Sequence, residues 1–198
     1  FHLHAETAEI YADALRRHHI VWGTGYAQSF ARLGAALIEG GGPRPHLRAV
    51  VTTSEKLSDA HRATIAEAFS CVVREEYSSI ENAFFASECE AGSLHVSPDV
   101  GVIEILREDG TATEPGEVGE VVATGLLGRL QPMIRYRVGD LAAWSEAPCA
   151  CGRAMPVLAE VAKIDARAKS LVVRAVGRVD PHVFFREAPA RLWKNCTH

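Results

Sequence analysis

The stretch from residue 47 to residue 81, LRAVVTTSEKLSDAHRATIAEAFSCVVREEYSSIE, decides the fold. Residues 47–53 form a short apolar run of the kind found in buried strands, and residues 71–77 form a second one. Between them, Ser58 is a typical helix N-cap, and a helical pattern continues to Phe69. Two strands joined by a helix of this length predict a parallel βαβ unit.

The residues before this stretch extend the same pattern. Residues 5–18 and 26–39 are rich in alanine and leucine at helical spacing, and residues 20–22 form a short apolar run between them. The second helical pattern stops at Gly40–Pro43 (GGGP), a strong terminator. Residues 1–88 are therefore predicted to form an α/β lobe with a parallel sheet.

Beyond residue 88 the pattern becomes β-rich. Turn signals at residues 108–110 and 114–116 separate short runs with no long helical period between them. The runs are residues 94–96, 100–106, 119–124, 133–136 and 141–144. Residues 89–176 are expected to form a small antiparallel sheet or a distorted, barrel-like lobe. Residues 177–198 show little periodicity and are assigned only as a hinge remnant and tail.

The composition limits the class of protein. The 198 residues carry a formal net charge of -4 with a pI near 6.1, whereas nucleic-acid binders usually have a basic excess. No apolar run approaches the roughly 20 residues that cross a bilayer. Five irregularly spaced cysteines do not form a secreted disulfide framework, so the cytoplasm is the expected location. The start without methionine predicts a fragment.

The segment Tyr77–Glu81 (YSSIE) follows the second buried run, where a strand gives way to a loop. Loops that leave the carboxyl ends of parallel strands are where α/β proteins bind ligands. An aromatic ring there can stack on a base, and a carboxylate can hold a magnesium ion that bridges phosphate oxygens. The alternative is a polar turn with a solvated glutamate, because short motifs are weak signals.

A second motif is residues 134–140 (IRYRVGD). A carboxylate after a glycine at a strand end, here Asp140, can accept both hydroxyls of a ribose. The neighbouring guanidiniums suit phosphate. The alternative is a β-turn at Gly139–Asp140 with two surface arginines.

The third motif combines Cys89 and His95 with Cys149 and Cys151. Zinc takes four Cys or His ligands tetrahedrally, commonly in pairs from tight turns. Gly92 and Gly152 allow such turns, so a closed structural zinc site is expected. The alternative is unrelated free thiols with His95 facing out from a strand. Elsewhere, Cys71 reads as a small core residue, Cys196 lies in the unassigned tail, and His18–His19 read as surface residues.

The order of the short motifs resembles the adenylate-forming superfamily of acyl-CoA synthetases, peptide-synthetase adenylation domains and luciferases. The motifs are SEKL (54–57), YSSIE (77–81), GEV (119–121), RYRVGD (135–140) and GRVD (177–180). Within the superfamily, PxIRYxxGD (132–140) followed by CxCGR (149–153) is similar to the phenylacetate–CoA ligase branch, with its coenzyme-F-adenylating and capsule-biosynthesis relatives. The resemblance covers most of residues 20–180.

The resemblance implies a role for each matching position. Tyr77 would stack against adenine, and Asp140 would bind the ribose hydroxyls. Ser79 at the α-phosphate and Glu81 at magnesium would be the catalytic residues. The remaining implied positions are the pocket wall at Ser54, Glu55 and Lys56, a ribose or phosphate contact at Arg178, and a hinge at Asp180. Gly25–Tyr26 is a weaker candidate for the acyl side, and a helix-start turn is the preferred interpretation there.

The resemblance also implies the reaction. The parent enzyme would be an ATP-dependent carboxylate–CoA ligase that forms an acyl-adenylate with magnesium and then transfers the acyl group to CoA. An aryl acid is the family's type substrate. The family's Ser/Thr/Gly-rich phosphate loop and C-terminal lysine are not found in these residues, and Pro181 replaces a second hinge aspartate. The 198-residue chain alone is therefore expected to be inactive.

Two other classes of function remain open. The chain can be a zinc-stapled binding or scaffold module derived from such a ligase, or a nucleotide-sensing module. Neighbouring coding sequence separates the scaffold from the enzyme, and ATP or AMP binding identifies the sensor. The sequence does not predict the oligomeric state or the acid.

Overall fold

The computed structural model describes residues 5–163. This part contains three helices, α1 (Ala5–Arg17), α2 (Ala27–Gly40) and α3 (Asp59–Phe69). Its strands are β1 (Trp22–Gly25), β2 (Ala49–Thr52), β3 (Val72–Ser78), β4 (Phe85–Glu88), β5 (Leu94–Val96), β6 (Gly101–Leu106), β7 (Gly119–Gly125), β8 (Tyr136–Trp144) and β9 (Val157–Lys163). Within the described part, residues 5–162 belong to one compact unit.

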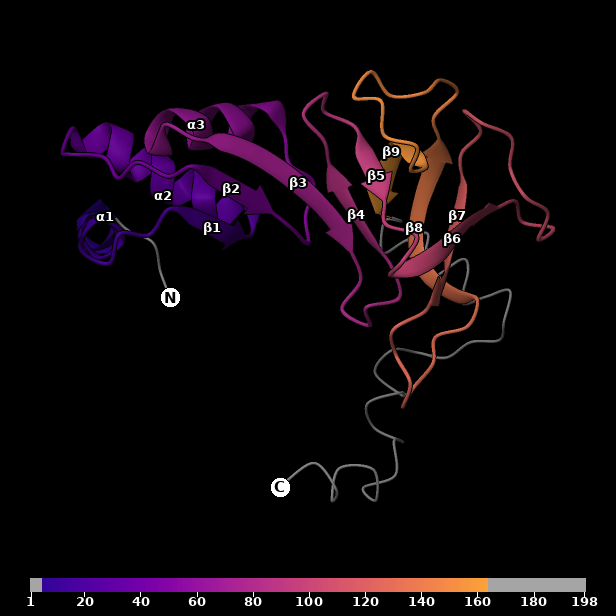
Figure 1. Cartoon of the computed structure of the whole chain (residues 1–198). Coiled ribbons are helices and arrows are strands. Elements are labelled where there is room, and N and C mark those ends of the chain that lie inside the picture. Colours follow the sequence, from indigo (N-terminus) through magenta and orange to yellow (C-terminus); the bar gives the residue numbers. More distant parts are fainter. Residues whose placement is uncertain (1–4, 164–198) are drawn as a thin grey trace. The chain divides into compact units, whose positions relative to one another are not determined.

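The first half contains the predicted parallel units. Strands β1, β2 and β3 pair in parallel, with α2 and α3 as the two crossovers (Figure 1). Right-handed crossovers between successive neighbouring strands place both helices on the same face of the sheet. The helices pack closely there, since a Cβ on Gly34 would lie 3.0 Å from the Cβ of Ala68. The βαβ prediction is confirmed.

The helix ends follow the signals in the sequence. The Ser58 side chain accepts a hydrogen bond of 3.2 Å from the His61 amide, as an N-cap does. Helix α2 is capped after Gly40 by Gly41, whose φ of 65° is the left-handed conformation that glycine adopts at low cost. The preferred interpretation of Gly25–Tyr26 as a helix start agrees with Tyr26 standing at the N-cap of α2.

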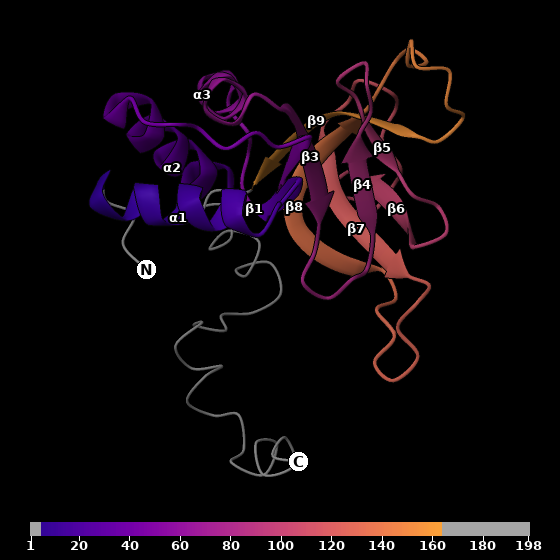
Figure 2. The same cartoon turned by 60° about the vertical axis from the view of Figure 1, so that its left-hand side comes forward.

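Strand β3 connects the parallel strands to an antiparallel sheet. Residues 72–75 pair with β2, whereas residues 76–78 pair antiparallel with β4. The strand order is β1-β2-β3-β4-β5-β9-β8-β7-β6, so one sheet of nine strands runs through the described residues (Figure 2). The fold is therefore mixed α/β, with the predicted parallel lobe followed by a β-rich part.

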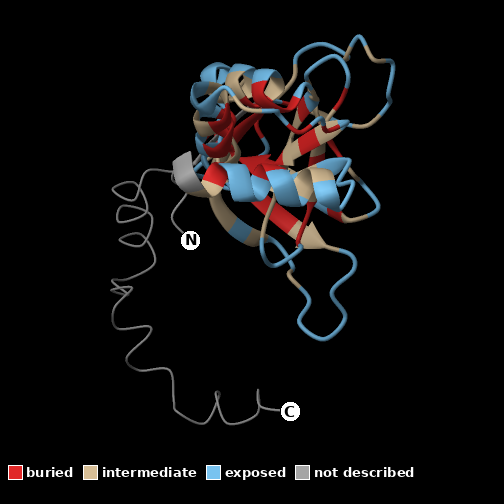
Figure 3. Cartoon of the chain, turned by 90° about the vertical axis from the view of Figure 1, so that its left-hand side faces the viewer, coloured by how far each residue is buried: buried red, intermediate tan, exposed pale blue. Residues whose placement is uncertain are grey.

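Two apolar cores hold these elements. Figure 3 shows buried segments in red inside the fold, while much of the outer helix surface is exposed and pale blue. The first contains Leu47, Val50, Ile65 and Phe69, and the second contains Phe84, Ile105 and Val121. Each side chain that leaves water in this way contributes roughly 1.5–3 kcal/mol. The division at residue 88 stays a prediction, and residues 177–198 lie outside the described part.

The prediction of two separate runs around Gly139 was wrong. Strand β8 is continuous from Tyr136 to Trp144, and Asp140 lies inside it rather than at its end. Gly139–Asp140 forms part of a β-bulge rather than a turn, because residues 138–140 lie opposite the single residue Val121 of β7. Gly139 has a φ of 82° there, and glycine adopts this conformation without strain. The bulge re-aims Asp140.

Strands β4 and β9 were not predicted from the sequence. In β4 the residues Phe85, Ala86, Ser87 and Glu88 give only a weak alternating pattern, and the strand is held by its neighbours β3 and β5. Within the described residues, none of the helices is long and apolar enough to cross a membrane.

Candidate nucleotide site and metal centre

The phenol of Tyr77 donates a hydrogen bond of 3.0 Å to Oδ2 of Asp140. Tyr77 lies near the end of β3, and the β8 bulge brings Asp140 to it from 63 residues away. The Tyr77 ring packs against Phe84 with centroids 4.8 Å apart. Burial, and then the charge of Asp140, raise the pKa of Tyr77, so the phenol stays a neutral donor. The structure thus joins the predicted adenine and ribose residues.

A second tyrosine and carboxylate lie in the same two segments. The phenol of Tyr136 donates a hydrogen bond of 3.0 Å to Oε1 of Glu81. Tyr136 is half-buried, and Glu81 is exposed in the loop after β3. Burial, followed by the hydrogen bond with Glu81, raises the pKa of Tyr136. Sequence reasoning missed Tyr136 as a site residue, although it lies inside the quoted motif.

The loop that carries Ser79 and Glu81 has a fixed backbone. The Ala83 amide donates to Oγ of Ser79 at 3.4 Å, and the Asn82 amide donates to the Ser79 carbonyl at 3.0 Å. Gly101 makes room for the loop, because a Cβ at that position would lie 2.0 Å from the Ala83 carbonyl oxygen. Close backbone approach of this kind requires glycine.

The two arginines of the second motif are paired with acids on neighbouring strands. Arg135 lies 3.1 Å from Glu104, and Arg137 lies 2.9 Å from Glu120. The Arg135 pair is exposed on both sides, so it is worth little in water, and Arg135 can leave Glu104 for a phosphate at small cost. Arg137 is half exposed, but its partner Glu120 is only 17% exposed, so breaking that pair would leave a mostly buried carboxylate.

In the predicted pocket wall, Glu55 contacts a distant segment of the chain. Its carboxylate accepts a hydrogen bond of 2.5 Å from the Gln28 amide, at the first turn of α2. Since Tyr26 provides no side-chain cap, Glu55 takes this role from a distant segment. Ser54 has a φ of 67°, and Lys56 is exposed. Arg178 and Asp180 lie outside the described residues.

Two turns with the same design bring the Cys/His motif together. In each turn a cysteine carbonyl accepts from the amide of a glycine three residues later: Gly92 donates to Cys89 at 3.0 Å, and Gly152 donates to Cys149 at 3.1 Å. Both glycines have positive φ, of 82° and 76°. The two glycines thus serve as the sequence predicts.

The four predicted ligand atoms lie within 4.8 Å of one another, on Cys89, His95, Cys149 and Cys151. Two sulfurs, those of Cys89 and Cys149, are 3.6 Å apart, and Sγ of Cys151 is 3.3 Å from Nε2 of His95. With Zn–S near 2.3 Å and Zn–N near 2.1 Å, a tetrahedron has edges of roughly 3.8 Å and roughly 3.6 Å for these pairs. The donor set therefore fits zinc.

The environment of His95 supports the same chemistry. Its side chain is fully buried, which excludes the alternative of a histidine facing out from the strand. Nδ1 lies 3.1 Å from the Met155 carbonyl oxygen, which can only accept, so Nδ1 carries the proton. Nε2 then keeps a free lone pair directed at the thiols, the usual arrangement of a metal-binding histidine.

The thiols of the cluster differ in how readily they ionise: the pKa of Cys151 is raised, because its hydrogen bond with the Arg153 backbone is outweighed by burial and by the neighbouring thiols. The pKa of Cys149 is lowered to about 7, first by a hydrogen bond from the Ser93 side chain. Arg153 and Glu90 connect the two turns through an exposed ion pair of 2.8 Å. Cys71 lies apart from the cluster, and burial raises the pKa of its thiol. Cys71 is half-buried against the first core, in line with its predicted packing role.

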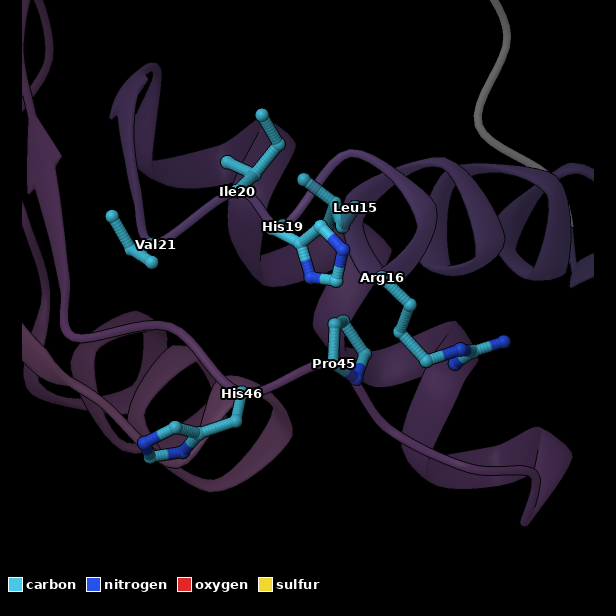
Figure 4. A pocket seen from close by; sticks show the side chains of 7 residues that line it. All are labelled: Leu15, Arg16, His19, Ile20, Val21, Pro45 and His46. Carbon is cyan, nitrogen blue, oxygen red and sulfur yellow. The ribbon is translucent and has the colours of Figure 1, made fainter.

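A shallow hollow of about 260 Å³ lies at the end of α1 (Figure 4). It is lined by Leu15, Arg16, His19, Ile20, Val21, Pro45 and His46. None of the predicted site residues lines it. The Arg16 guanidinium is already engaged by the Pro43 carbonyl and by Asp13, so the hollow offers little free charge.

Comparison with known structures defines the class of fold. A 2-hydroxyisobutyryl-CoA ligase in complex with R3-HIB-AMP is similar over 83% of this chain and 37% of its own length, with a TM-score of 0.67 and 22% identity. A long-chain-fatty-acid-CoA ligase from Archaeoglobus fulgidus is similar over 87% of this chain and 40% of its own, with a TM-score of 0.56 and 13% identity. The described residues therefore have the fold of part of an adenylate-forming ligase.

Among curated proteins, Protein CapK of Staphylococcus aureus is 34% identical over 92 residues. That match covers 46% of this chain and 19% of CapK. No family model matches the sequence. The chain thus spans well under half the length of the proteins it resembles.

Proposed function

We propose that this chain is part of an ATP-dependent carboxylate–CoA ligase of the phenylacetate–CoA ligase-like branch. The observation that carries the proposal is the pairing of Tyr77 with Asp140, two residues of separate motifs that meet only in the fold. The fold itself is shared with ligases that were captured with R3-HIB-AMP, or with 2-HIB-AMP and CoA. The 92-residue stretch that is 34% identical to Protein CapK is the sequence similarity that accompanies this shared fold.

In the proposed site, the acyl-adenylate is held from the adenine and ribose side. Asp140 keeps one carboxylate oxygen for the ribose hydroxyls while the other accepts from Tyr77. The Tyr77 ring offers a face to adenine. Glu81 holds magnesium, and Ser79 contacts the α-phosphate region. Charge neutralisation at phosphate is the main catalytic contribution in such reactions.

The remaining predicted residues have supporting roles in this proposal. Ser54 and Glu55 belong to the pocket wall, which the Glu55 cap ties to α2. Arg178 contacts ribose or phosphate, and Asp180 marks the hinge. The substrate is a carboxylic acid, with an aryl acid as the leading candidate, and the acceptor is CoA.

Zinc at the four-ligand cluster is proposed as a structural ion. When bound, it neutralises the thiolates and cross-links the two glycine turns. A complete Cys/His set leaves no coordination position open for substrate, which separates this site from catalytic zinc centres. The metal would stabilise the sheet around β5 without taking part in the reaction.

Titration of the chain with AMP, followed by NMR, tests the proposed function. Wild-type protein is expected to bind AMP, and Asp140→Asn is expected to weaken binding by roughly 10-fold to 150-fold, because a hydrogen bond to a charged group is worth roughly 1.5–3 kcal/mol. Asp99→Asn, in an exposed turn, is the control. Absence of binding, or equal binding by both variants, contradicts the proposal. The chain alone is expected to catalyse no ATP–pyrophosphate exchange with any acid.

The competing function is a zinc-stapled binding or scaffold module that has lost the chemistry. The intact geometry of the Cys/His cluster favours it, since this cluster does not depend on nucleotide. Zinc without AMP binding would identify the scaffold. AMP binding that Asp140→Asn reduces would identify the ligase.

A further inference from the structure

The two nucleotide motifs contain the same spacing and use it reciprocally. Tyr77 is followed four residues later by Glu81, and Tyr136 is followed four residues later by Asp140. The tyrosine of each segment donates to the carboxylate of the other, at 3.0 Å in both cases. We call these four residues, Tyr77, Glu81, Tyr136 and Asp140, the clasp.

The clasp has a buried end and an exposed end. At the buried end, Asp140 is only 8% exposed, and Tyr77 packs on the second core. At the other end, Glu81 is exposed, so its hydrogen bond adds little to folding stability. A contact that contributes little to folding and fixes an exposed carboxylate points to a role in binding.

The backbone around Glu81 is already held without the clasp. Ser79 and Ala83 close the turn, and Gly101 accepts the loop at close range. What remains free is the Glu81 side chain, since an exposed glutamate samples many rotamers and loses up to about 2 kcal/mol of entropy when it is fixed. The phenol of Tyr136 selects one of these rotamers and leaves the second oxygen, Oε2, available.

We propose that Tyr136 is a positioning residue that pre-orients the Glu81 carboxylate for the divalent cation of a nucleoside triphosphate. Through the clasp, the cation carboxylate and the ribose carboxylate are set at a fixed separation before nucleotide arrives. This inference rests on the proposed function. The inference gives Tyr136 an indirect role, because its hydroxyl contacts neither the nucleotide nor the cation in this proposal and acts only through Glu81.

The test compares two ligands in the 198-residue chain: AMP without metal, and ATP with Mn²⁺. The affinity is measured by NMR for AMP and by isothermal titration calorimetry with preformed Mn²⁺–ATP for ATP. Tyr136→Phe is expected to weaken Mn²⁺–ATP binding by roughly threefold to tenfold, the effect of one hydrogen bond, and to leave AMP binding within about twofold. Tyr77→Phe, at the ribose end, is expected to weaken both ligands.

A double-mutant cycle provides the decisive readout. In a Glu81→Gln background, Tyr136→Phe is expected to have no further effect on Mn²⁺–ATP, because the carboxylate it orients is gone. Additive losses, equal losses for both ligands, or no loss with Tyr136→Phe would each overturn the positioning role and leave the proposed function intact. A wild-type chain that binds neither ligand would reject the proposed function, and the role of Tyr136 with it.

Discussion

Removal of zinc is expected to lower the stability of the chain by a measurable amount. The perturbation is the double variant Cys149→Ser, Cys151→Ser, which removes one turn's ligands and leaves Cys89 and His95 in place. Both of the remaining ligands are almost fully buried, at 1% and 0% exposure. Without the metal they become buried polar groups with incomplete partners, which proteins avoid.

The magnitude follows from mass action. A ligand present at about 1,000 times its dissociation constant stabilises the folded state by about 4 kcal/mol. For a protein of this size, 1 kcal/mol shifts the melting temperature by roughly 2–4 °C. The double variant, or the wild type with excess chelator, is therefore expected to melt about 8–16 °C below the zinc-loaded protein. Elemental analysis should give close to one zinc per wild-type chain.

Cys71→Ser is the matched control, since Cys71 is a thiol outside the cluster. It should keep the zinc content and the sensitivity to chelator, whatever its own effect on stability. A wild-type chain that contains no zinc and melts at the same temperature with and without chelator would refute the metal centre.

Two further substitutions, one of them with a control variant, test the packing of the loop at Ala83 and the burial of the Glu75 carboxylate. Gly101→Ala is expected to lower the free energy of unfolding by about 3 kcal/mol and to displace the loop at Ala83, since overpacking costs 1–3 kcal/mol and the clash is with backbone. The control is Gly128→Ala, where the nearest atom to the added Cβ is 3.4 Å away, and it should change the melting temperature little. Burial, and then the charge of Glu88, raise the pKa of Glu75, so ionised Glu75 destabilises the fold at neutral pH. Glu75→Gln should therefore stabilise the protein at pH 7. This gain should disappear below the unfolded-state pKa of glutamate, where Glu75 is protonated in both the folded and the unfolded protein. An equal gain at pH 7 and at low pH would show that the charge of Glu75 is not the cause.

The sequence was most informative where local signals and global fold agree. The cap at Ser58 and the apolar runs on either side of α3 predict the βαβ unit without any long-range information. The metal cluster was also predictable, since Gly92 and Gly152 each mark a tight turn next to a cysteine. In both cases a few neighbouring residues determine the conformation.

Long-range contacts account for what the sequence did not predict. Gly139–Asp140 has the composition of a turn, and only pairing with β7 makes it a bulge within a strand. The hydrogen bond from Tyr136 to Glu81 joins residues 55 apart, and no local pattern encodes it. The capping of α2 by Glu55 is likewise set by the tertiary fold.

The position of bound AMP tests the central claim most directly. An isotope-filtered NOE spectrum of the labelled chain with AMP is expected to show adenine protons near the Tyr77 ring and ribose protons near Gly139 and Asp140. Contacts instead with His19 and His46, in the hollow at the end of α1, or no intermolecular contacts at all, would contradict the assignment of this face as a nucleotide site.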